Sequence, residues 1–320
     1  MEEVLETTLW VVERSRHVRL DRAALEGFAG KLARERPAIP RWDYRYHFFD
    51  GGERTVGYLL VLDSLNFCFW PPPGQPKWTI QYGEERLSGY FALAAALKRA
   101  VEEGEPLLEP DYLARLTLED LKGILGGEGQ LQLLDQRRAI LNELGRVLLE
   151  SYAGRAAELV AAAGGSAVEL ARLLARELSS FRDVARYEGR EVHFYKRAQL
   201  FAADLWGAFQ GEGFGGFADI ARLTAFADYK LPQVLRHLGI LRYSPELAAR
   251  IDRGELIPAG SPEEVEIRAN TIWAVERLKQ ALAERDFRLS SVELDWLLWG
   301  LGQREEFREK PYHRTVTIFY

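Results

Sequence analysis

The sequence LTAFADYKLPQVLRHLGIL, residues 223–241, has the pattern of a helix ending, a short break and a second helix. Pro232 suits the first turn of the second helix, because the N–H that proline lacks would have no partner there, and Gly239 suits its end. Helical patterns of this kind recur along most of the chain. They predict a mainly α protein.

The break in this stretch carries Asp228, Tyr229 and Lys230 between two apolar runs. Asp228 lies just before a helix N-terminus. One interpretation is a capping carboxylate that accepts hydrogen bonds from the unpaired N–H groups of the first turn. The other is a catalytic acid held on a turn between helices. The residues alone leave both open.

The rest of the chain divides by its periodicity. Residues 1–35 are expected to be helical, with Asp21 as a cap, and residues 84–320 are expected to be mostly helical. Alternating, aromatic-rich segments predict a small antiparallel β-sheet over about residues 41–83, and the tail PYHRTVTIFY, residues 311–320, alternates like a strand. We expect one domain over residues 1–320 or two closely packed lobes, since single cores stop growing at roughly 250–300 residues.

Composition narrows the class of protein. The formal net charge of −6 argues against a protein that binds duplex nucleic acid, which needs a basic face. Cys68 is the only cysteine, so no disulfide framework is expected and a reducing, cytoplasmic setting fits. The chain has no uninterrupted apolar run of about 18 residues, which argues against a membrane span, and its acidic beginning is unlike a signal peptide.

No motif indicates a cofactor or a metal. The chain lacks a Walker-type phosphate loop, a His-Glu-x-x-His motif and a Gly-x-Ser-x-Gly motif. The glycines of GEGFGGF do not follow a predicted strand, so they do not form a dinucleotide fingerprint. We therefore expect neither a cofactor nor a metal site.

The segment HFYKRAQLF places Lys196 and Arg197 at or near the start of a helix. Cations there oppose the helix dipole, and a bound anion such as a phosphate would resolve the conflict. The alternative is a solvated basic turn. His193 is expected to be a hydrogen-bonded structural histidine rather than a ligand.

The segment LDSLNFCFW places Asn66 beside Phe67, Phe69 and Trp70. An amide next to aromatic faces can hold a flat heterocycle and hydrogen-bond its edge. The alternative is a strand whose aromatic side chains fill the core.

Near the C-terminus, Ser290 and Glu293 have the spacing of a capping box, so Glu293 is expected to be structural. Asp295 follows on the same helix, where it either reaches a ligand or lies on the solvated face. His313 and Arg314 are expected to form a salt bridge, if they have no role in a binding site.

Four segments together resemble the queuosine salvage protein family. They occur in the family's order and are LDSLNFCFWP (62–71), FYKRAQLFAADLW (194–206), LTAFADYKLPQVLRHLGIL (223–241) and PYHRTVTIFY (311–320). The resemblance runs from about residue 40 to the C-terminus. It implies a largely helical fold similar to that of DNA glycosylases. It also implies hydrolysis of the N-glycosidic bond of queuosine 5'-monophosphate, which releases queuine, a 7-deazaguanine base, for reinsertion into tRNA.

The resemblance also implies roles for particular residues. Asp228 would be the catalytic carboxylate, Lys196 a phosphate ligand, and the segment from Asn66 to Trp70, with Phe67 and Phe69, part of the base pocket. From side-chain chemistry we add a second set as substrate-binding candidates, namely Arg197, Tyr229, Lys230, Asp295, His313 and Arg314. A 7-deaza base has no N7 to protonate, so we expect Tyr229, Lys230 or His313 to assist its departure. The partners expected are this nucleotide and queuine, with no nucleic acid polymer and no membrane, for a monomeric chain.

Two other functions are compatible with the residues. One is a glycosylase that acts on a modified base in DNA, which the acidic balance disfavours. The other is a helical scaffold that binds a partner protein, which would leave the clustered polar residues around Lys196 and Asp228 unexplained. A deep cavity joining these two segments would favour an enzyme over a scaffold.

Overall fold

The computed structural model describes all of residues 1–320 and shows a mainly α protein built around two hydrophobic cores. It has fourteen α-helices and three separate two-stranded antiparallel pairs. The predicted fold class is therefore confirmed. No helix combines the length and the apolar character that a membrane crossing requires.

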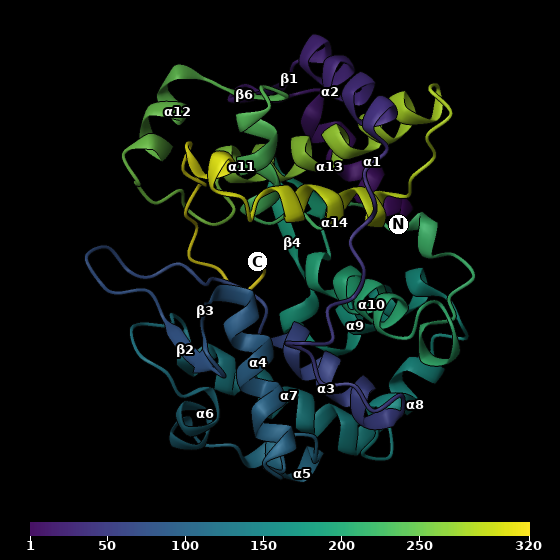
Figure 1. Cartoon of the computed structure of the whole chain (residues 1–320), viewed down its shortest axis with the longest axis vertical. Coiled ribbons are helices and arrows are strands. Elements are labelled where there is room, and N and C mark those ends of the chain that lie inside the picture. The colour runs from purple at the N-terminus through teal and green to yellow at the C-terminus, as the bar shows by residue number, and fades with distance from the viewer.

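The larger core lies in the lower half of Figure 1, where the middle of the chain folds. Its helices are α3 (Glu53–Ser64), α4 (Gly89–Glu102), α5 (Pro110–Arg115), α6 (Leu118–Leu125), α7 (Leu134–Ser151), α8 (Ala156–Ala161), α9 (Ala167–Glu177) and α10 (Lys196–Ala208). Two hairpins flank them, β2 (Thr79–Tyr82) with β3 (Glu85–Ser88) and β4 (Val184–Tyr187) with β5 (Arg190–His193).

The smaller core is formed by the two ends of the chain, in the upper half of Figure 1. Its helices are α2 (Arg22–Glu35), α11 (Lys230–His237), α12 (Pro245–Asp252), α13 (Pro262–Ala283) and α14 (Ser291–Leu301). The strands β1 (Val18–Leu20) and β6 (Leu241–Tyr243) pair antiparallel and join the N-terminal segment to the C-terminal one. α1 (Glu2–Val12) packs on α13 and adds its apolar face to the larger core.

Short 3-10 turns complete the chain at Ser179–Phe181, Gly213–Gly215, Ile220–Arg222 and Glu305–Arg308. The last ten residues form no strand, contrary to the prediction. They run between the two halves, where only Arg314 forms a single bridge, to Leu256. Their alternation instead reflects burial of every second side chain, including His313, Thr315 and Thr317.

The predicted sheet over residues 41–83 is wrong except at its end. Residues 41–52 form no strand, and α3 occupies Glu53–Ser64. Nine of the twelve residues of α3 are buried, so the helix is apolar on nearly all sides. A continuous apolar run of this length does not distinguish a buried strand from a buried helix. Only β2 falls within the predicted region.

The start of α3 shows why residues 50–52, with the sequence DGG, do not connect two strands of a hairpin. The Asp50 carboxylate accepts hydrogen bonds from the Gly52 N–H at 2.9 Å and from the Thr55 hydroxyl at 2.7 Å. A carboxylate that receives the donors of a first turn begins a helix rather than closing a hairpin. Asp21 does the same for α2, where it accepts from the Ala24 N–H at 2.9 Å, as predicted. The predicted helical region of residues 1–35 is, however, interrupted by β1.

For the stretch from Leu223 to Leu241, the second half of the prediction is confirmed and the first half is wrong. Its second part is α11, which contains Pro232 in its first turn and is followed by Gly239 at a φ of 73°. Its first part is not the end of a helix. Residues 223–229 form an irregular buried strip that leads from a 3-10 turn into α11. This strip carries Asp228 into the space between the two halves of the molecule.

Candidate active site

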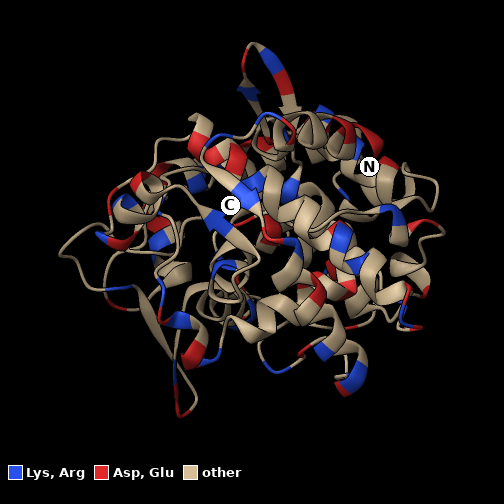
Figure 2. Cartoon of the chain, turned by 90° about the horizontal axis from the view of Figure 1, so that it is seen from above, with Lys and Arg blue, Asp and Glu red and all other residues tan.

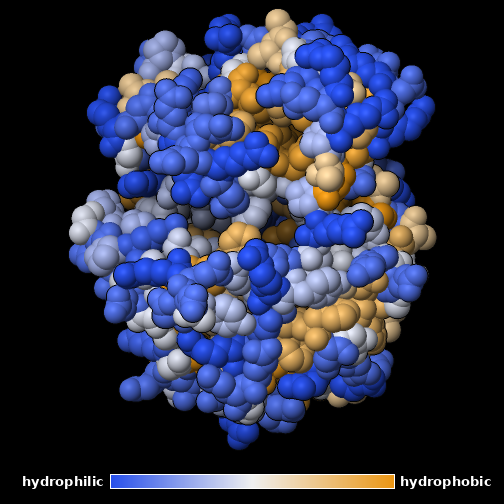
Figure 3. All heavy atoms as spheres, in the orientation of Figure 1, coloured by the Kyte–Doolittle hydropathy of each residue, from blue (hydrophilic) through white to orange (hydrophobic).

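A cavity of about 650 Å³ lies between the two halves of the molecule and receives side chains from both. In the view of Figure 3, a hollow is visible between the upper and lower halves. The size lies within the range of small-molecule sites, roughly 300–1,000 Å³. Nine of the eleven candidate residues line it, namely Asn66, Phe67, Phe69, Lys196, Asp228, Tyr229, Lys230, Asp295 and Arg314. The other two, Arg197 and His313, do not.

Asp228 is both a helix cap and a cavity residue. Its Oδ1 accepts hydrogen bonds from the Lys230 N–H at 2.7 Å and the Leu231 N–H at 2.9 Å, so the capping interpretation is confirmed. Oδ2 accepts no hydrogen bond from the protein, and only 9% of the residue is exposed. Burial raises the pKa of Asp228, while the Lys196 ammonium and the two N–H donors lower it. One carboxylate oxygen thus remains available to a ligand.

Asp295 supports the strip that carries Asp228. It lies on α14, is 4% exposed, and its Oδ2 accepts a hydrogen bond from the Phe226 N–H at 2.7 Å. Burial raises the pKa of Asp295 well above its ordinary value, and the neighbouring Asp228 adds to the rise. The expected capping box at the start of α14, between Ser290 and Glu293, is present.

Lys196 begins α10, as expected, but its surroundings are acidic. Its backbone N–H donates to Asp183 Oδ2 at 3.1 Å, so a carboxylate already occupies the helix N-terminus. Its Nζ approaches the Asn66 carbonyl oxygen at 3.4 Å, and the residue is 5% exposed. Burial lowers the pKa of Lys196, and Asp228 opposes this most strongly among the nearby carboxylates.

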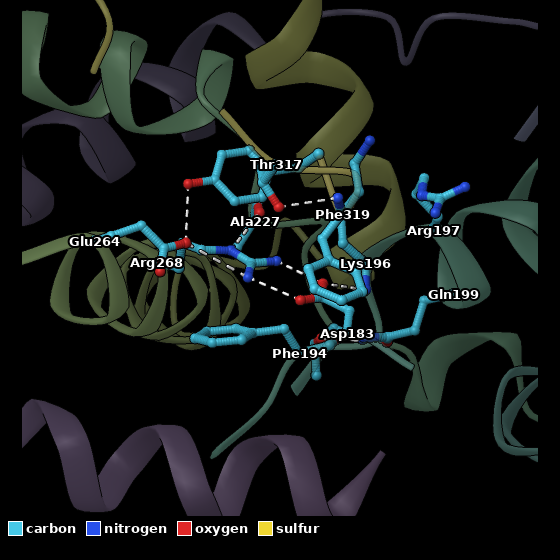
Figure 4. A network of polar contacts seen from close by, with 12 residues as sticks. Asp183, Phe194, Lys196, Arg197, Gln199, Ala227, Glu264, Arg268, Thr317 and Phe319 are labelled. Carbon is cyan, nitrogen blue, oxygen red and sulfur yellow. Dashed lines mark hydrogen bonds and ion pairs between the residues drawn. The ribbon is translucent and has the colours of Figure 1, made fainter. Parts of the chain in front are cut away.

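A buried ion pair links Lys196 to the strip that carries Asp228 (Figure 4). Arg268 of α13 donates to both carboxylate oxygens of Asp183, at 2.9 and 2.6 Å, and its Nε donates to the Ala227 carbonyl at 3.1 Å. Asp183 in turn accepts from the Lys196 N–H. One guanidinium therefore fixes the backbone next to Asp228 relative to the start of α10.

Arg197 has a structural position instead of a place in the cavity. Its guanidinium donates to the carbonyls of Asp63 at 2.9 Å, Ser64 at 2.5 Å and Ser180 at 2.5 Å. It therefore holds the last turn of α3, whose carbonyls have no partner within the helix. Arg137 of α7 does the same for the carbonyls of Leu65 and Phe67. Arg137 was not identified from the sequence, because nothing but a position within a predicted helix distinguishes it there.

The segment from Asn66 to Trp70 is irregular rather than a strand. The Phe67 ring lies 4.1 Å from the Arg137 guanidinium and 5.0 Å from that of Arg197. Phe67 and Trp70 belong to a small buried apolar cluster, so part of this segment fills the core as the alternative interpretation held. Asn66, Phe67, Phe69 and Trp70 nevertheless all line the cavity as well.

His313 and Arg314 do not form salt bridges. His313 is buried, its Nε2 lies 3.3 Å from the Tyr320 hydroxyl, and its Nδ1 has no partner. Burial, with the nearby Arg268 guanidinium, lowers the pKa of His313 to about 3, so the ring is neutral. Arg314 lines the cavity and lies 5.9 Å from the Trp70 ring.

Three cations gather at the cavity rim, and we call Lys77, Lys230 and Arg308 the rim cations. All three line the cavity. Burial lowers the pKa of Lys230 to about 8; the Asp228 carboxylate opposes this, and both other rim cations add to the lowering. The hydrogen bonds of Lys230 and Arg308 go to neutral oxygens, those of Gln233 and Gln303. The rim therefore carries positive charge that no carboxylate pairs directly.

A helix N-terminus faces the same rim. The Lys77 Nζ lies next to Gly89, the first residue of α4, 4.0 Å from where a Cβ on Gly89 would be. The Ser88 side chain makes no capping hydrogen bond, and both Ser88 and Gly89 line the cavity. Unpaired N–H groups at a helix start, together with cations, favour an anion.

Aromatic side chains form much of the remaining wall. Trp299 of α14 makes edge contacts with Tyr90 at 5.9 Å and Phe91 at 5.5 Å between ring centroids. Trp42 lies 4.3 Å from His47, and its indole N–H is buried without a partner. Tyr229 lies 4.9 Å from Tyr312. Aromatic walls of this kind suit a planar ring.

No group of three or more His, Cys, Asp or Glu side chains is arranged to hold a metal. In the view of Figure 2, Lys and Arg alternate with Asp and Glu over the helices and loops, without one continuous basic stripe.

Comparison with known proteins decides the family. The family model described as "Queuosine salvage protein" matches residues 46–320. This chain belongs to the queuosine salvage protein family. The resemblance found in the four sequence segments is thereby confirmed.

Members of the family from distant organisms match over nearly their whole length. A protein of Sphaerobacter thermophilus, named queuosine 5'-phosphate N-glycosylase/hydrolase, is 53% identical over 317 residues, which cover 99% of this chain and 97% of that protein. Proteins of the same name from Mus musculus and Schizosaccharomyces pombe are 37% and 31% identical. These cover 98% and 99% of this chain, and 98% and 96% of their own lengths. The similarity therefore includes the N-terminal helices as well as the segment that the family model matches.

Proposed function

We propose that this protein hydrolyses the N-glycosidic bond of queuosine 5'-monophosphate and releases queuine. The observation that carries the proposal is Asp228, a buried carboxylate with one free oxygen, which faces a cavity of nucleotide size. Relatives named for this activity match the chain from end to end. Negative charge gathers near Lys196, and positive charge gathers at the rim cations. These two regions fit the ribose and the phosphate of such a substrate, respectively.

The chemistry requires a fixed negative charge beside the sugar. Breaking the bond between C1' and a base nitrogen builds positive charge on the ribose, as in glycoside hydrolysis. The Asp228 carboxylate is preorganised by two N–H donors and by Lys196, so it stabilises this charge without rearranging. Lys196 acts here by keeping Asp228 ionised despite burial.

We place the 5'-phosphate at the rim cations and not at Lys196. A phosphate dianion next to Lys196 would also meet Asp228, the carboxylate that acts most strongly on Lys196, and its negative charge would repel the phosphate. The rim offers Lys77, Lys230 and the N-terminus of α4 instead, with no competing ion pair. Phosphate binding there is remote from the broken bond, so it serves to position the ribose over Asp228.

The base would then lie against the aromatic wall around Trp299 and Trp42. Trp42 and Trp299 both line the cavity, so their rings can contact the faces of a planar base. Asp295 and Asn66, which both line the cavity, present acceptor oxygens that suit the N1–H and amino donors of a guanine-like edge.

The test is incubation of the purified protein with queuosine 5'-monophosphate, followed by mass detection of queuine and ribose 5-phosphate. We expect both products from the wild-type protein. Absence of queuine, under conditions where the protein is folded and the substrate is stable, would refute the proposal.

A further inference from the structure

Two buried carboxyl groups lie on the packed helices α3 and α10, and neither forms a salt bridge. Asp63 lies in the last turn of α3, is 0% exposed, and neither of its carboxyl oxygens has a hydrogen-bond partner. Asp204 lies on α10, which packs against α3, and is 3% exposed. Its Oδ2 is buried and also lacks a partner. Asp204 lines the cavity, whereas Asp63 does not.

Ionising both Asp63 and Asp204 would cost free energy, because both carboxyl groups are buried. Removing a carboxylate from water costs several kcal/mol unless cations or donors compensate for it. The guanidinium of Arg197 is engaged with backbone carbonyls, so Lys196 is the cation left near Asp204. Burial raises the pKa of Asp63 to about 7 and that of Asp204 well above its ordinary value, where the charge of Asp63 adds to the rise.

A proton on one carboxyl resolves the arrangement. It removes one charge and supplies the donor that two carboxylates cannot give each other. The unpartnered oxygens of Asp63 and Asp204 then become a hydrogen-bonded acid and carboxylate. Pairs of this kind share one proton because both members cannot ionise side by side.

The donors and acceptors at His47 and Tyr90 can be assigned, and the assignment is compatible with a protonated Asp204. His47 Nδ1 lies 2.7 Å from the Asp43 carbonyl, which can only accept, so Nδ1 carries the proton. His47 Nε2 is then the acceptor, and the Tyr90 hydroxyl donates to it at 2.8 Å. Burial lowers the pKa of His47 to about 4, which keeps the ring neutral. Asp204 is the other polar neighbour of the Tyr90 hydroxyl. Because the single Tyr90 proton goes to His47, the Tyr90 oxygen can only accept a hydrogen bond from Asp204, and this requires a protonated Asp204 carboxyl.

We propose that Asp63 and Asp204 hold one proton between them and that Asp204 delivers it to the departing base. This inference rests on the proposed function. It replaces Tyr229, Lys230 and His313 as the expected source of assistance to the leaving group.

The step balances as follows. The bond between C1' and the base nitrogen breaks, and its electron pair stays on the base. The proton moves from Asp204 to a ring nitrogen of the base, because position 7 is a carbon and cannot receive it. Water adds its oxygen to C1', and its surplus proton returns to the carboxyl pair. The pair is thereby restored, and one water is consumed for each bond broken.

The first experiment detects the proton without any substrate. Infrared spectra of the wild-type protein at pH 7 should contain the carbonyl stretch of a protonated, buried carboxyl. The difference spectrum between the wild type and the double variant D63N/D204N should contain that band, whereas the exposed-site control Asp111→Asn should give no such difference. Asp295, whose pKa is also raised, contributes equally to all three spectra and cancels. Identical spectra of the wild type and the double variant would overturn the inference. Because no nucleotide is present, this result is independent of whether the proposed substrate is correct.

The second experiment tests delivery of the proton. Asp204→Asn should slow single-turnover cleavage of queuosine 5'-monophosphate by about a hundredfold or more, the lower range for loss of a general acid. Cleavage of p-nitrophenyl riboside 5-phosphate, whose leaving group departs without a proton, should fall less than about threefold, because no acid is then required. Equal losses on the two substrates would show a structural role and overturn the proposal.

The pH profile supplies a further check. The groups that face Asp204 are Asp63 from α3, Tyr90 from α4, Lys196 from α10 and Asp295 from α14. Asp63→Asn removes a negative charge that disfavours ionisation of Asp204. The alkaline fall in cleavage rate should therefore move to lower pH in this variant, and an unchanged profile would contradict proton sharing. Thermal unfolding of each variant confirms that it is folded.

Discussion

The rim cations give the sharpest prediction about substrate choice. Replacing Lys77 and Arg308 with methionine, singly and together, removes charge but keeps most of the apolar stem of each side chain. Both residues are exposed at the cavity rim, so their attraction for a phosphate is partly screened by water. Two unit charges about 4 Å apart attract by about 1 kcal/mol in water and about 4 kcal/mol near a protein surface.

We take the lower half of that range, about 1–2 kcal/mol for each rim cation, because the sites are open to solvent. Since about 1.4 kcal/mol corresponds to a factor of ten, each single variant should lose about five- to thirtyfold in kcat/KM for queuosine 5'-monophosphate. The double variant should lose roughly a hundredfold or more.

The assay compares the nucleotide with queuosine, which lacks the phosphate. Cleavage of queuosine should change less than about twofold in the same variants, because the lost interaction is with the phosphate alone. Lys31→Met, which removes an exposed lysine on α2 remote from the cavity lining, is the control. Equal losses on nucleotide and nucleoside would refute a phosphate site at the rim.

Three further predictions follow from the same contacts. Because burial holds the pKa of Lys230 at about 8, this lysine loses its charge above that pH, and KM for the nucleotide should rise there while KM for queuosine stays level. Lys196→Met should slow cleavage of both substrates by similar factors, at least about tenfold. Because Lys196 lowers the pKa of Asp228, the acid limb of the rate profile should also move to higher pH. A loss confined to the nucleotide would show instead that Lys196 binds the phosphate. Arg268→Met leaves Asp183 buried without its partner and should destabilise the protein by about 3–5 kcal/mol in denaturant unfolding, so an unchanged midpoint would contradict the role assigned to this ion pair.

The sequence predicted well where a local pattern carries the information. The helix that follows Asp228 was identified from Pro232 and Gly239, and the cap at Asp21 from its spacing. Asp228 itself stood out because a carboxylate interrupts two apolar runs. The structure adds that capping and facing the cavity are compatible, since one carboxylate oxygen serves each purpose.

The sequence misled where burial is complete. The helix α3 is apolar on nearly every side, so its residues have no polar face from which to read a period of 3.6. The strip from residue 223 to 229 is buried and irregular, and its backbone partners, Asp295 and Arg268, come from distant helices. Long-range hydrogen bonds of this kind leave no local signal.

Several residues used in the proposals above were not identified from the sequence for the same reason. Asp63 lies in a segment predicted as part of the sheet, and Asp204 lies inside a helical run, where a carboxylate is ordinarily interpreted as part of a solvated face. Lys77 lies in a loop rich in proline, and only the fold brings it to the start of α4. Lys196, in contrast, was found at its helix start, but its carboxylate neighbours come from other segments and have no local signal in the sequence.

The account depends most on Asp228, and single-turnover cleavage of queuosine 5'-monophosphate tests it most directly. Asp228→Asn keeps the shape of the side chain and an oxygen that can accept from the Lys230 and Leu231 N–H groups, but it removes the negative charge. We predict that release of queuine falls at least about a hundredfold while the nucleotide still binds, the loss expected for one preorganised electrostatic group. Release of queuine at a near-normal rate by this variant would contradict the central claim.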